Sequence, residues 1–141
     1  MVKNMNWMEE SKVDIRQYNG ESLCEMLADK IWDYHREEWL KCPEFIQNAC
    51  FLIDFDTELN MEGILTILKN TAAEYLPHII KAFRAIGDSQ DAEILAEISR
   101  CKPSEPVEKI VELEQQLYLN RDFDIWELLY QYLDKEIEKL K

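Results

Sequence analysis

Residues 77–98 read PHIIKAFRAIGDSQDAEILAEI, and this stretch predicts two helices joined by a tight turn. Pro77 suits the first turn of a helix, where its missing N–H costs nothing. Gly87 is placed to end that helix in the left-handed conformation, and Asp88 or Ser89 can cap the next helix. Apolar residues recur at helical spacing on both sides of the turn: Ile79, Ile80, Phe83 and Ile86 before it, and Ile94, Leu95 and Ile98 after it.

The chain before this hairpin carries the same helical period. Helices are predicted over residues 23–34, 42–60 and 61–68, with a bend near Gly63. Ser22 is a candidate N-cap of the first of these helices, and Glu25 three residues later completes a capping box. Within the first helix the inward stripe consists of Leu23, Met26 or Leu27, Ile31 and Tyr34.

The chain after the hairpin predicts two more helices. Pro103 and Pro106 break the chain, and a last helix is expected from about Asp122, with acids at its start and lysines near its end as the helix dipole favours. The inward residues are Val107, Ile110, Val111 and Leu117 in the first helix, and Trp126, Leu129, Leu133, Ile137 and Leu140 in the second. The sequence therefore predicts an all-α fold, a single-domain bundle of six or seven helices.

The first 20 residues differ from the rest of the chain. Val13, Ile15 and Tyr18 alternate, which indicates a short extended segment packed on the body of the protein, and Asn19-Gly20 indicates a turn. The predicted organisation is an N-terminal segment over residues 1–20 and a helical domain over residues 21–141.

Net charge is the most unusual property of the chain. Its 141 residues include 29 acidic and 16 basic residues, a formal net charge of −13 at pH 7. Such a charge repels nucleic acid and anionic membranes and attracts basic partners. Residues 1–20 hold no apolar core of a signal peptide, and no stretch approaches the ~20 apolar residues of a membrane span, so we expect a cytoplasmic protein. The cysteines lack metal-binding spacing, so we expect them to be free thiols.

The acids are concentrated in the second half of the chain. Between Asp88 and Glu127 there are eleven acidic and four basic residues, so about half of the net charge lies in little more than a quarter of the chain. Carboxylates on rigid helices can imitate a row of phosphates, although a solvated helix face that only ensures solubility is the plainer interpretation. The candidate partner-binding acids are Asp88, Asp91, Glu93, Glu97, Glu105, Glu108, Glu112, Glu114, Asp122 and Asp124.

No enzyme motif is present in the sequence. Three isolated glycines cannot build a phosphate-binding loop, and neither His35 nor His78 has the context of a catalytic triad. We therefore expect no catalytic residues and no cofactor.

One row of carboxylates leaves several interpretations open. Asp54, Glu58 and Glu62 are spaced four residues apart, so a continuous helix would place them on one face, where like charges cost a few tenths of a kcal/mol per pair. A divalent cation could compensate them. Pairing with Lys or Arg, helix capping or simple solvation are the alternatives, and no Glu-x-x-His motif supports a di-metal site, so no metal ligands are assigned.

The same region resembles the bacterial DNA-mimic protein family, most of whose members have unknown function. Residues 54–64 read DFDTELNMEGI, where the family commonly has an acidic residue followed by Glu-Val-Asn-Asn-Gly-Gly-Phe. Glu58, Asn60 and Gly63 match this motif, whereas Met61 and Glu62 depart from it. Asn70, and the Pro-led helix that ends in Ala-Ile-Gly at residues 85–87, also resemble the family, and the similarity extends over about residues 39–140.

The resemblance implies an all-α protein without enzymatic activity. In the characterised member a dimer presents carboxylates that imitate the DNA backbone and occupy a transcription factor's DNA-binding surface. By this resemblance the chain would bind a basic protein such as a DNA-binding regulator, would not bind nucleic acid itself, and could form a homodimer, while Glu58, Asn60 and Gly63 would be structural. Alternatives are an immunity protein that neutralises a nuclease toxin and a carboxylate metal-binding protein.

Overall fold

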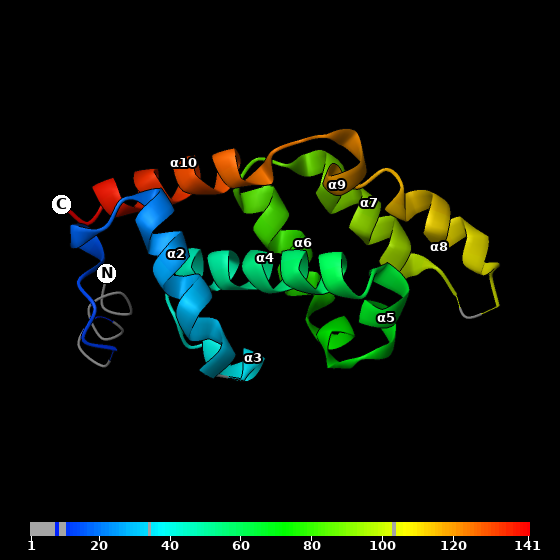
Figure 1. Cartoon of the computed structure of the whole chain (residues 1–141), viewed down its shortest axis with the longest axis horizontal. Helices are drawn as coiled ribbons and strands as arrows, with labels where there is room; N and C mark the ends of the chain where they lie inside the picture. The colour runs from blue at the N-terminus through cyan, green and yellow to red at the C-terminus, as the bar shows by residue number, and fades with distance from the viewer. Residues whose placement is uncertain (1–7, 9–10, 34, 103) are drawn as a thin grey trace.

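The computed structural model describes residues 8, 11–33, 35–102 and 104–141, and every regular element within them is helical (Figure 1). Three short 3₁₀ turns lie at Ile15–Gln17, Ile31–Asp33 and Thr71–Tyr75. The α-helices are α2 (Gly20–Lys30), α3 (Arg36–Trp39), α4 (Glu44–Met61), α5 (Ile64–Lys69), α6 (Leu76–Ala85), α7 (Ser89–Arg100), α8 (Val107–Glu114), α9 (Tyr118–Arg121) and α10 (Ile125–Glu138).

The all-α class is confirmed, but the helix number is not. The described residues form nine α-helices rather than six or seven. The two that the sequence did not indicate, α3 and α9, have four residues each. A helix of a single turn contains no repeat of an apolar stripe, so periodicity cannot reveal it.

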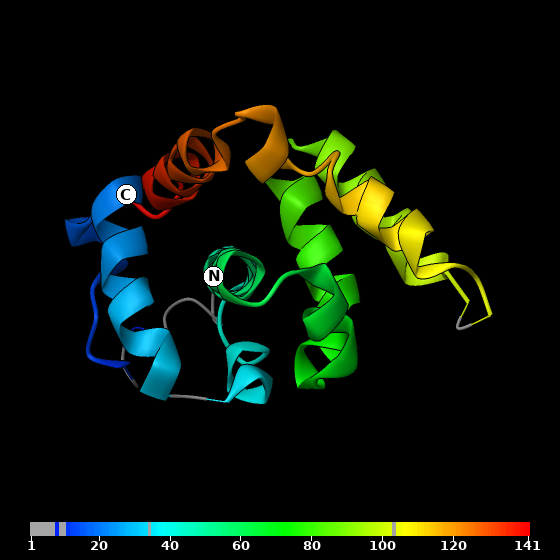
Figure 2. The ribbon, with the colours of Figure 1, turned by 45° about the vertical axis from the view of Figure 1, so that its right-hand side comes forward.

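Helix α4 forms the centre of the molecule. Eleven of its 18 residues are buried, and Phe51 and Phe55 are each only 1% exposed. Figure 2 shows α4 end-on inside an arch made by α2, α10 and α6. The ring centroid of Phe51 lies 5.1 Å from that of Trp39 in α3, and that of Phe55 lies 5.8 Å from that of Phe83 in α6. Such edge-to-face ring pairs stabilise the contact between layers beyond simple burial.

The predicted hairpin is confirmed and consists of α6 and α7. Gly87 has a φ of +92°, its N–H donates to the carbonyl oxygen of Arg84, and the N–H of Asp88 donates to that of Phe83. This pair of bonds is the Schellman arrangement that ends a helix. Asp88 is the N-cap of α7, because its side chain accepts the backbone N–H of Asp91 at 3.1 Å.

The start of the first long helix differs from the prediction. Asn19, not Ser22, is the N-cap of α2; its side chain accepts the N–H of Ser22, whose hydroxyl accepts the N–H of Asn19. Gly20 is therefore the first helical residue rather than part of a turn. Upstream, Ile15 is buried but lies in a 3₁₀ turn instead of an extended segment. The rest of the predicted N-terminal segment, residues 1–7, 9 and 10, lies outside the described residues, as do Tyr34 and Pro103.

The stripe predicted for the helix after Pro106 is partly wrong. Val107 is 53% exposed and Val111 is 36% exposed, whereas Leu117 is buried. Helix α8 packs against α5 and α7 at one end of the molecule (Figure 1), so the side that faces away from these two neighbours meets solvent.

The last helix, α10, begins three residues later than predicted. Asp122 has a φ of +59° and ends α9, and Asp124 caps α10 by accepting the backbone N–H of Trp126 at 2.9 Å. Leu129 and Leu133 of α10 are buried as expected. No helix in the described ranges combines the length and apolar character that crossing a bilayer requires, and none of the four cysteines forms a disulfide.

Candidate protein-binding surface

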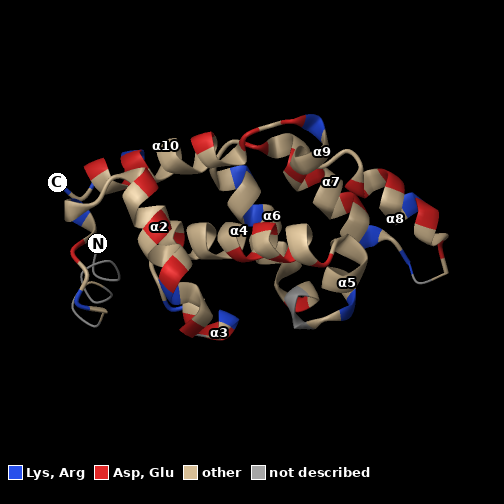
Figure 3. Ribbon diagram, viewed as in Figure 1, with Lys and Arg blue, Asp and Glu red and all other residues tan. Residues whose placement is uncertain are grey.

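The ten candidate acids do not share one environment. Asp88 is 4% exposed and Asp91 is fully buried, so neither can contact a partner and their assignment to a binding surface is wrong. The other eight are exposed or half-buried: Glu93, Glu97, Glu105, Glu108, Glu112, Glu114, Asp122 and Asp124. Figure 3 shows that acidic positions occur on α2, α4 and α10 as well as on α7 and α8.

Asp91 holds the segment after α8 against α7. The guanidinium of Arg121 donates to both carboxylate oxygens of Asp91, at 3.0 and 3.1 Å, and the backbone N–H of Tyr118 donates to Oδ1 at 2.9 Å. A buried carboxylate requires such partners, because an unpaired charge in the interior is strongly destabilising. Asp91 is therefore a structural residue that fastens α9 to α7.

Asp88 occupies the same buried region with fewer partners. Its Oδ1 caps α7, whereas its Oδ2 is buried and makes no hydrogen bond to any described residue. Burial, together with the neighbouring carboxylate of Asp91, raises the pKa of Asp88 to about 7. The side chain therefore titrates near neutral pH and is kept partly protonated by its surroundings.

The exposed acids of α7 and α8 form two short rows, which we call the acidic arm (Glu93, Glu97, Glu108 and Glu112). On each helix the two glutamates are four residues apart and so lie on one face. Helices α7 and α8 pack against each other at the end of the molecule distant from α2 and the C-terminus (Figure 1). The acidic arm is therefore carried on rigid elements at the edge of the fold.

Two acids in this region have basic partners. Glu93 pairs with Arg84 at 3.1 Å, and Glu105 pairs with Lys109 at 2.7 Å. The Lys109 ammonium lowers the pKa of Glu105. Exposed pairs of this kind contribute about 0–1 kcal/mol, so a partner with its own arginines and lysines can displace them at little cost.

Three glutamates of the acidic arm remain available for a partner. Glu97, Glu108 and Glu112 are exposed and make no ion pair within the described part of the chain. Glu114 differs, because it turns inward and its Oε2 accepts the backbone N–H of Ile64 at 2.8 Å. Glu114 therefore joins α8 to α5 and is only partly exposed.

The spacing of the glutamates within each row of the acidic arm is wider than the axial spacing of DNA phosphates. Residues four apart on a helix are separated by about 6 Å along its axis. One strand of duplex DNA carries one phosphate per about 3.4 Å of axis. A single helix row thus has roughly half the charge density of one DNA strand.

A second acidic row was not recognised in the sequence. Glu21, Glu25 and Asp29 are exposed and spaced four residues apart along α2, and we call them the α2 row. Burial and the charges of nearby groups, including Glu21, Glu25 and Asp124, raise the pKa of Tyr130 in α10. Acids of α2 and of the start of α10 therefore lie near Tyr130. The four-residue spacing of these acids within one predicted helix is the signal in the sequence that indicates this row.

The carboxylate row on α4 is compensated by an arginine. Arg36 donates to both carboxylate oxygens of Asp54, at 2.8 and 3.1 Å, and to Glu58 at 3.0 Å. Asn70, which ends α5, donates to the other oxygen of Glu58 at 3.3 Å, and Glu62 is exposed. No group of three His, Cys, Asp or Glu side chains within the described residues is placed to hold a metal ion. The sequence left several interpretations of this row open. For Asp54 and Glu58, the structure supports pairing with a basic residue.

The other motif residues shape the corner between α4 and α5. Gly63 has a φ of +82°, a conformation that favours glycine, and it lies between the two helices. Asn60 donates to the backbone carbonyl of Asp56 at 2.7 Å, and the hydroxyl of Tyr118 donates to the carboxylate of Asp56 at 2.6 Å. These hydrogen bonds are all made within the chain. The bond between Tyr118 and Asp56 joins α9 to α4.

Comparison with known protein families gives a match over most of the chain. The model of a family described as DMP19-like protein matches residues 40–140, more than two thirds of the chain. The matched residues include α4 to α10 and thus the acidic arm together with Asp54, Glu58 and Asn70, whereas Arg36 and the α2 row lie outside them. No curated protein and no solved structure matches this chain.

Proposed function

Since the chain belongs to the DMP19-like protein family, we propose that it is a non-catalytic protein that binds a basic, DNA-binding protein in place of DNA. In this proposal the acidic arm takes the position of the DNA backbone. The partner contributes the lysines and arginines with which it otherwise contacts phosphates.

One observation carries the proposal: Glu97, Glu108 and Glu112 are exposed, carry no ion pair to the described residues and stand on helices that pack together. The helical backbone that carries these charges is already ordered, so binding a partner restricts only the side chains and more of the attraction remains as affinity. The net charge of −13 adds a long-range attraction for basic proteins and accelerates encounter.

Two variants with equal net charge test this surface. The arm variant carries Glu97→Gln, Glu108→Gln and Glu112→Gln, and the α2 variant carries Glu21→Gln, Glu25→Gln and Asp29→Asn. Each changes the formal net charge from −13 to −10. Wild-type protein and both variants are immobilised, exposed to nuclease-treated lysate of the source organism and eluted with increasing salt.

The proposal expects wild type and the α2 variant to retain a DNA-binding protein that elutes at moderate salt, because screening weakens contacts between exposed charges. The arm variant should retain much less of it. Equal retention by both variants would show that bulk charge, not the acidic arm, causes binding. A retained nuclease in place of a regulator would support the alternative role in toxin neutralisation.

A further inference from the structure

Helix α8 leaves most of its apolar side chains without a covering neighbour. Four of its eight residues are apolar (Val107, Ile110, Val111 and Leu113), and of these only Leu113 is buried. Val107 and Val111 are exposed, and because they are four residues apart they share one face of the helix. Helix α8 lies at the edge of the molecule, where it packs against α5 and α7 (Figure 1). Single exposed apolar residues are ordinary, whereas neighbouring ones on one helix face form a surface that another chain can cover.

The exposed valines lie beside two acids of the acidic arm. Glu108 and Glu112 each follow a valine directly, and since successive residues of a helix are about 100° apart, the two glutamates form a row next to that of Val107 and Val111. Both glutamates are exposed and make no ion pair to the described residues. Helix α8 thus presents an apolar row and an anionic row side by side.

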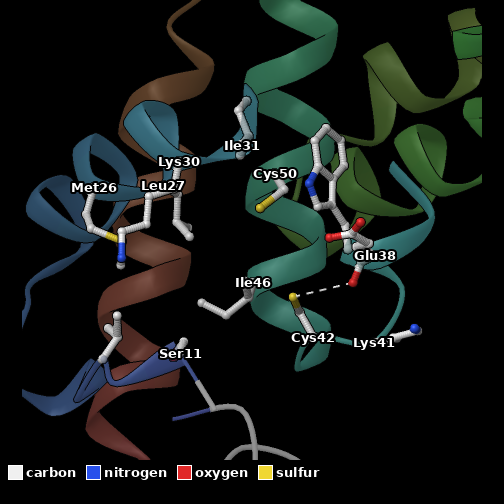
Figure 4. Close-up of a pocket in the computed structure, with 12 residues that line it drawn as sticks. Ser11, Met26, Leu27, Lys30, Ile31, Glu38, Lys41, Cys42, Ile46 and Cys50 are labelled. Carbon is white, nitrogen blue, oxygen red and sulfur yellow. Dashed lines mark hydrogen bonds between the residues drawn. The ribbon is translucent and has the colours of Figure 1, made fainter. Parts of the chain in front are cut away.

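A pocket at the start of α4 is the contrasting case. It has a volume of about 380 Å³, and its apolar lining includes Met26 and Ile46 (Figure 4). The charged residues of the lining are two lysines and one glutamate, Lys30, Lys41 and Glu38, so positive charge predominates beside this apolar surface and disfavours a basic partner. On α8 the apolar side chains are accompanied by negative charge, and charge complementarity therefore selects a basic partner for this helix.

The two rows on α8 repeat at the period of an α-helix. Residues four apart are separated by about 6 Å along a helix axis, so a second helix laid alongside α8 has the same repeat. A helix also offers two adjacent rows on one face, whereas the side chains of a strand alternate between opposite faces. A helix can therefore face the valines and the glutamates at the same time.

We propose that α8 binds a basic amphipathic helix of the partner, with apolar side chains against Val107 and Val111 and lysines or arginines against Glu108 and Glu112. This inference rests on the proposed function, which makes the partner basic, and it adds an apolar contact to the charged one. Many DNA-binding proteins place a helix in the major groove, and such a helix of the partner is the occupant that we assign to this face. Removing the valines from water stabilises the complex even at salt concentrations that screen the charges.

Synthetic helical peptides of equal composition test this geometry on the full chain. Each peptide has leucine at every fourth position and an equal number of arginines in a background of alanine and glutamine. Arginine directly follows each leucine in one matched peptide and directly precedes it in the other, so that both relative orientations of the two helices are covered. The control peptide has its arginines on the face opposite the leucines. Each peptide is titrated into isotope-labelled protein, and the methyl resonances of Val107 and Val111 are followed by NMR.

One of the matched peptides should shift the methyl signals of both valines. It should also bind about tenfold more tightly than the control peptide, because its leucines and the two valines are removed from water together. Equal affinity of all the peptides would show that charge alone causes binding and would overturn the inference. Unchanged signals of Val107 and Val111 at saturating peptide would overturn it as well.

Two further proteins separate the apolar contact from the charge. The valine variant carries Val107→Thr and Val111→Thr, which keep the shape and the net charge, and it should bind the matched peptide about fivefold more weakly. Trp32→Gln removes an exposed ring from the 3₁₀ turn after α2, and it should leave the affinity unchanged.

The arm variant distinguishes failure of this inference from failure of the proposed function. It should weaken the binding of every peptide, since all of them carry arginines. If the arm variant weakens binding and the valine variant does not, the acidic surface of the proposed function stands and the apolar contact is wrong. If neither variant weakens binding, the result contradicts both the apolar contact and the acidic arm.

Discussion

Two arginines neutralise carboxylates that this acidic chain buries. Arg36 holds Asp54 and Glu58 on α4, and Arg121 holds Asp91 on α7. A buried ion pair adds little stability compared with an apolar pair of the same size, but removing one partner leaves a charge in the interior without compensation. The two arginines thus have a larger effect on folding than their surface counterparts.

Replacing Arg121 tests this difference. Arg121→Gln should lower the free energy of unfolding by about 3 kcal/mol, because Asp91 remains buried with its charge unpaired. Arg84→Gln is the matched control, since Arg84 pairs with Glu93 on the surface, and it should cost less than about 1 kcal/mol. Urea denaturation followed by circular dichroism measures both; similar losses would contradict the structural role of Asp91.

Asp88 should make the stability depend on pH. The unfolded chain titrates Asp near 3.8, whereas burial raises the pKa of Asp88 in the folded protein to about 7. Because the folded state holds the proton more tightly, its stability should rise as the pH falls from 8 towards 4, by at most about 4 kcal/mol from this group. Asp88→Asn keeps a good N-cap and removes the titration.

The difference in unfolding free energy between wild type and Asp88→Asn, measured from pH 5 to pH 8, isolates this effect. Asp54 and Asp56 also have raised pKa values, and these shifts remain in the variant and cancel in the comparison. A constant difference across this range would show that Asp88 is not buried with an unsatisfied oxygen.

At the scale of helices, the sequence predicted every α-helix of more than one turn and the hairpin at Gly87. It could not predict α3 and α9, because four residues carry no period, and it placed the start of α2 wrongly because both Asn19 and Ser22 are good capping residues. Exposure of Val107 and burial of Asp91 depend on which helices pack together. These packing partners are determined by the tertiary structure, and the spacing of residues within one helix does not reveal them.

Gly20 shows how tertiary contact decides a local choice. A Cβ atom at this position would lie 2.1 Å from the carbonyl oxygen of Tyr130, so α2 and α10 can approach only with glycine there. Gly20→Ala should therefore lower the free energy of unfolding by about 3 kcal/mol, although alanine is the better helix former.

Gly87→Ala provides the comparison for that measurement. Its Cβ would meet no atom within 4 Å, and the cost comes only from the positive φ. We expect about 1 kcal/mol from this strain. If Gly20→Ala were no more destabilising than Gly87→Ala in thermal or urea unfolding, the close contact of α2 with α10 would be wrong.

At the scale of the molecule, one set of acids stabilises the packing of the helices and another set supplies the surface charge. The buried acids are paired or serve as caps, whereas the acidic arm and the α2 row project into solvent. The sequence places the candidate surface in the second half of the chain, and this stays a prediction. The sequence could not separate the buried Asp88 and Asp91 and the partly buried Glu114 from the exposed acids. Side-chain direction within α7 and α8 depends on the packing of the whole bundle.

The arm variant should fold as well as wild type. Neutralising Glu97, Glu108 and Glu112 removes exposed charges and some repulsion between residues four apart, so the free energy of unfolding should change by less than about 0.5 kcal/mol per substitution. Thermal unfolding of wild type, the arm variant and the α2 variant checks this. A large loss in the arm variant would mean that these glutamates support the fold and would make them unsuitable as a binding surface.

Competition with DNA tests the central claim most directly. The retained DNA-binding partner is bound to a fluorescent duplex, and this protein is added at fixed ionic strength while the anisotropy of the duplex is recorded. The proposed function predicts that wild type and the α2 variant release the duplex and that the arm variant does so only at much higher concentration. A ternary complex, in which partner, duplex and this protein remain together at saturation, would contradict DNA mimicry.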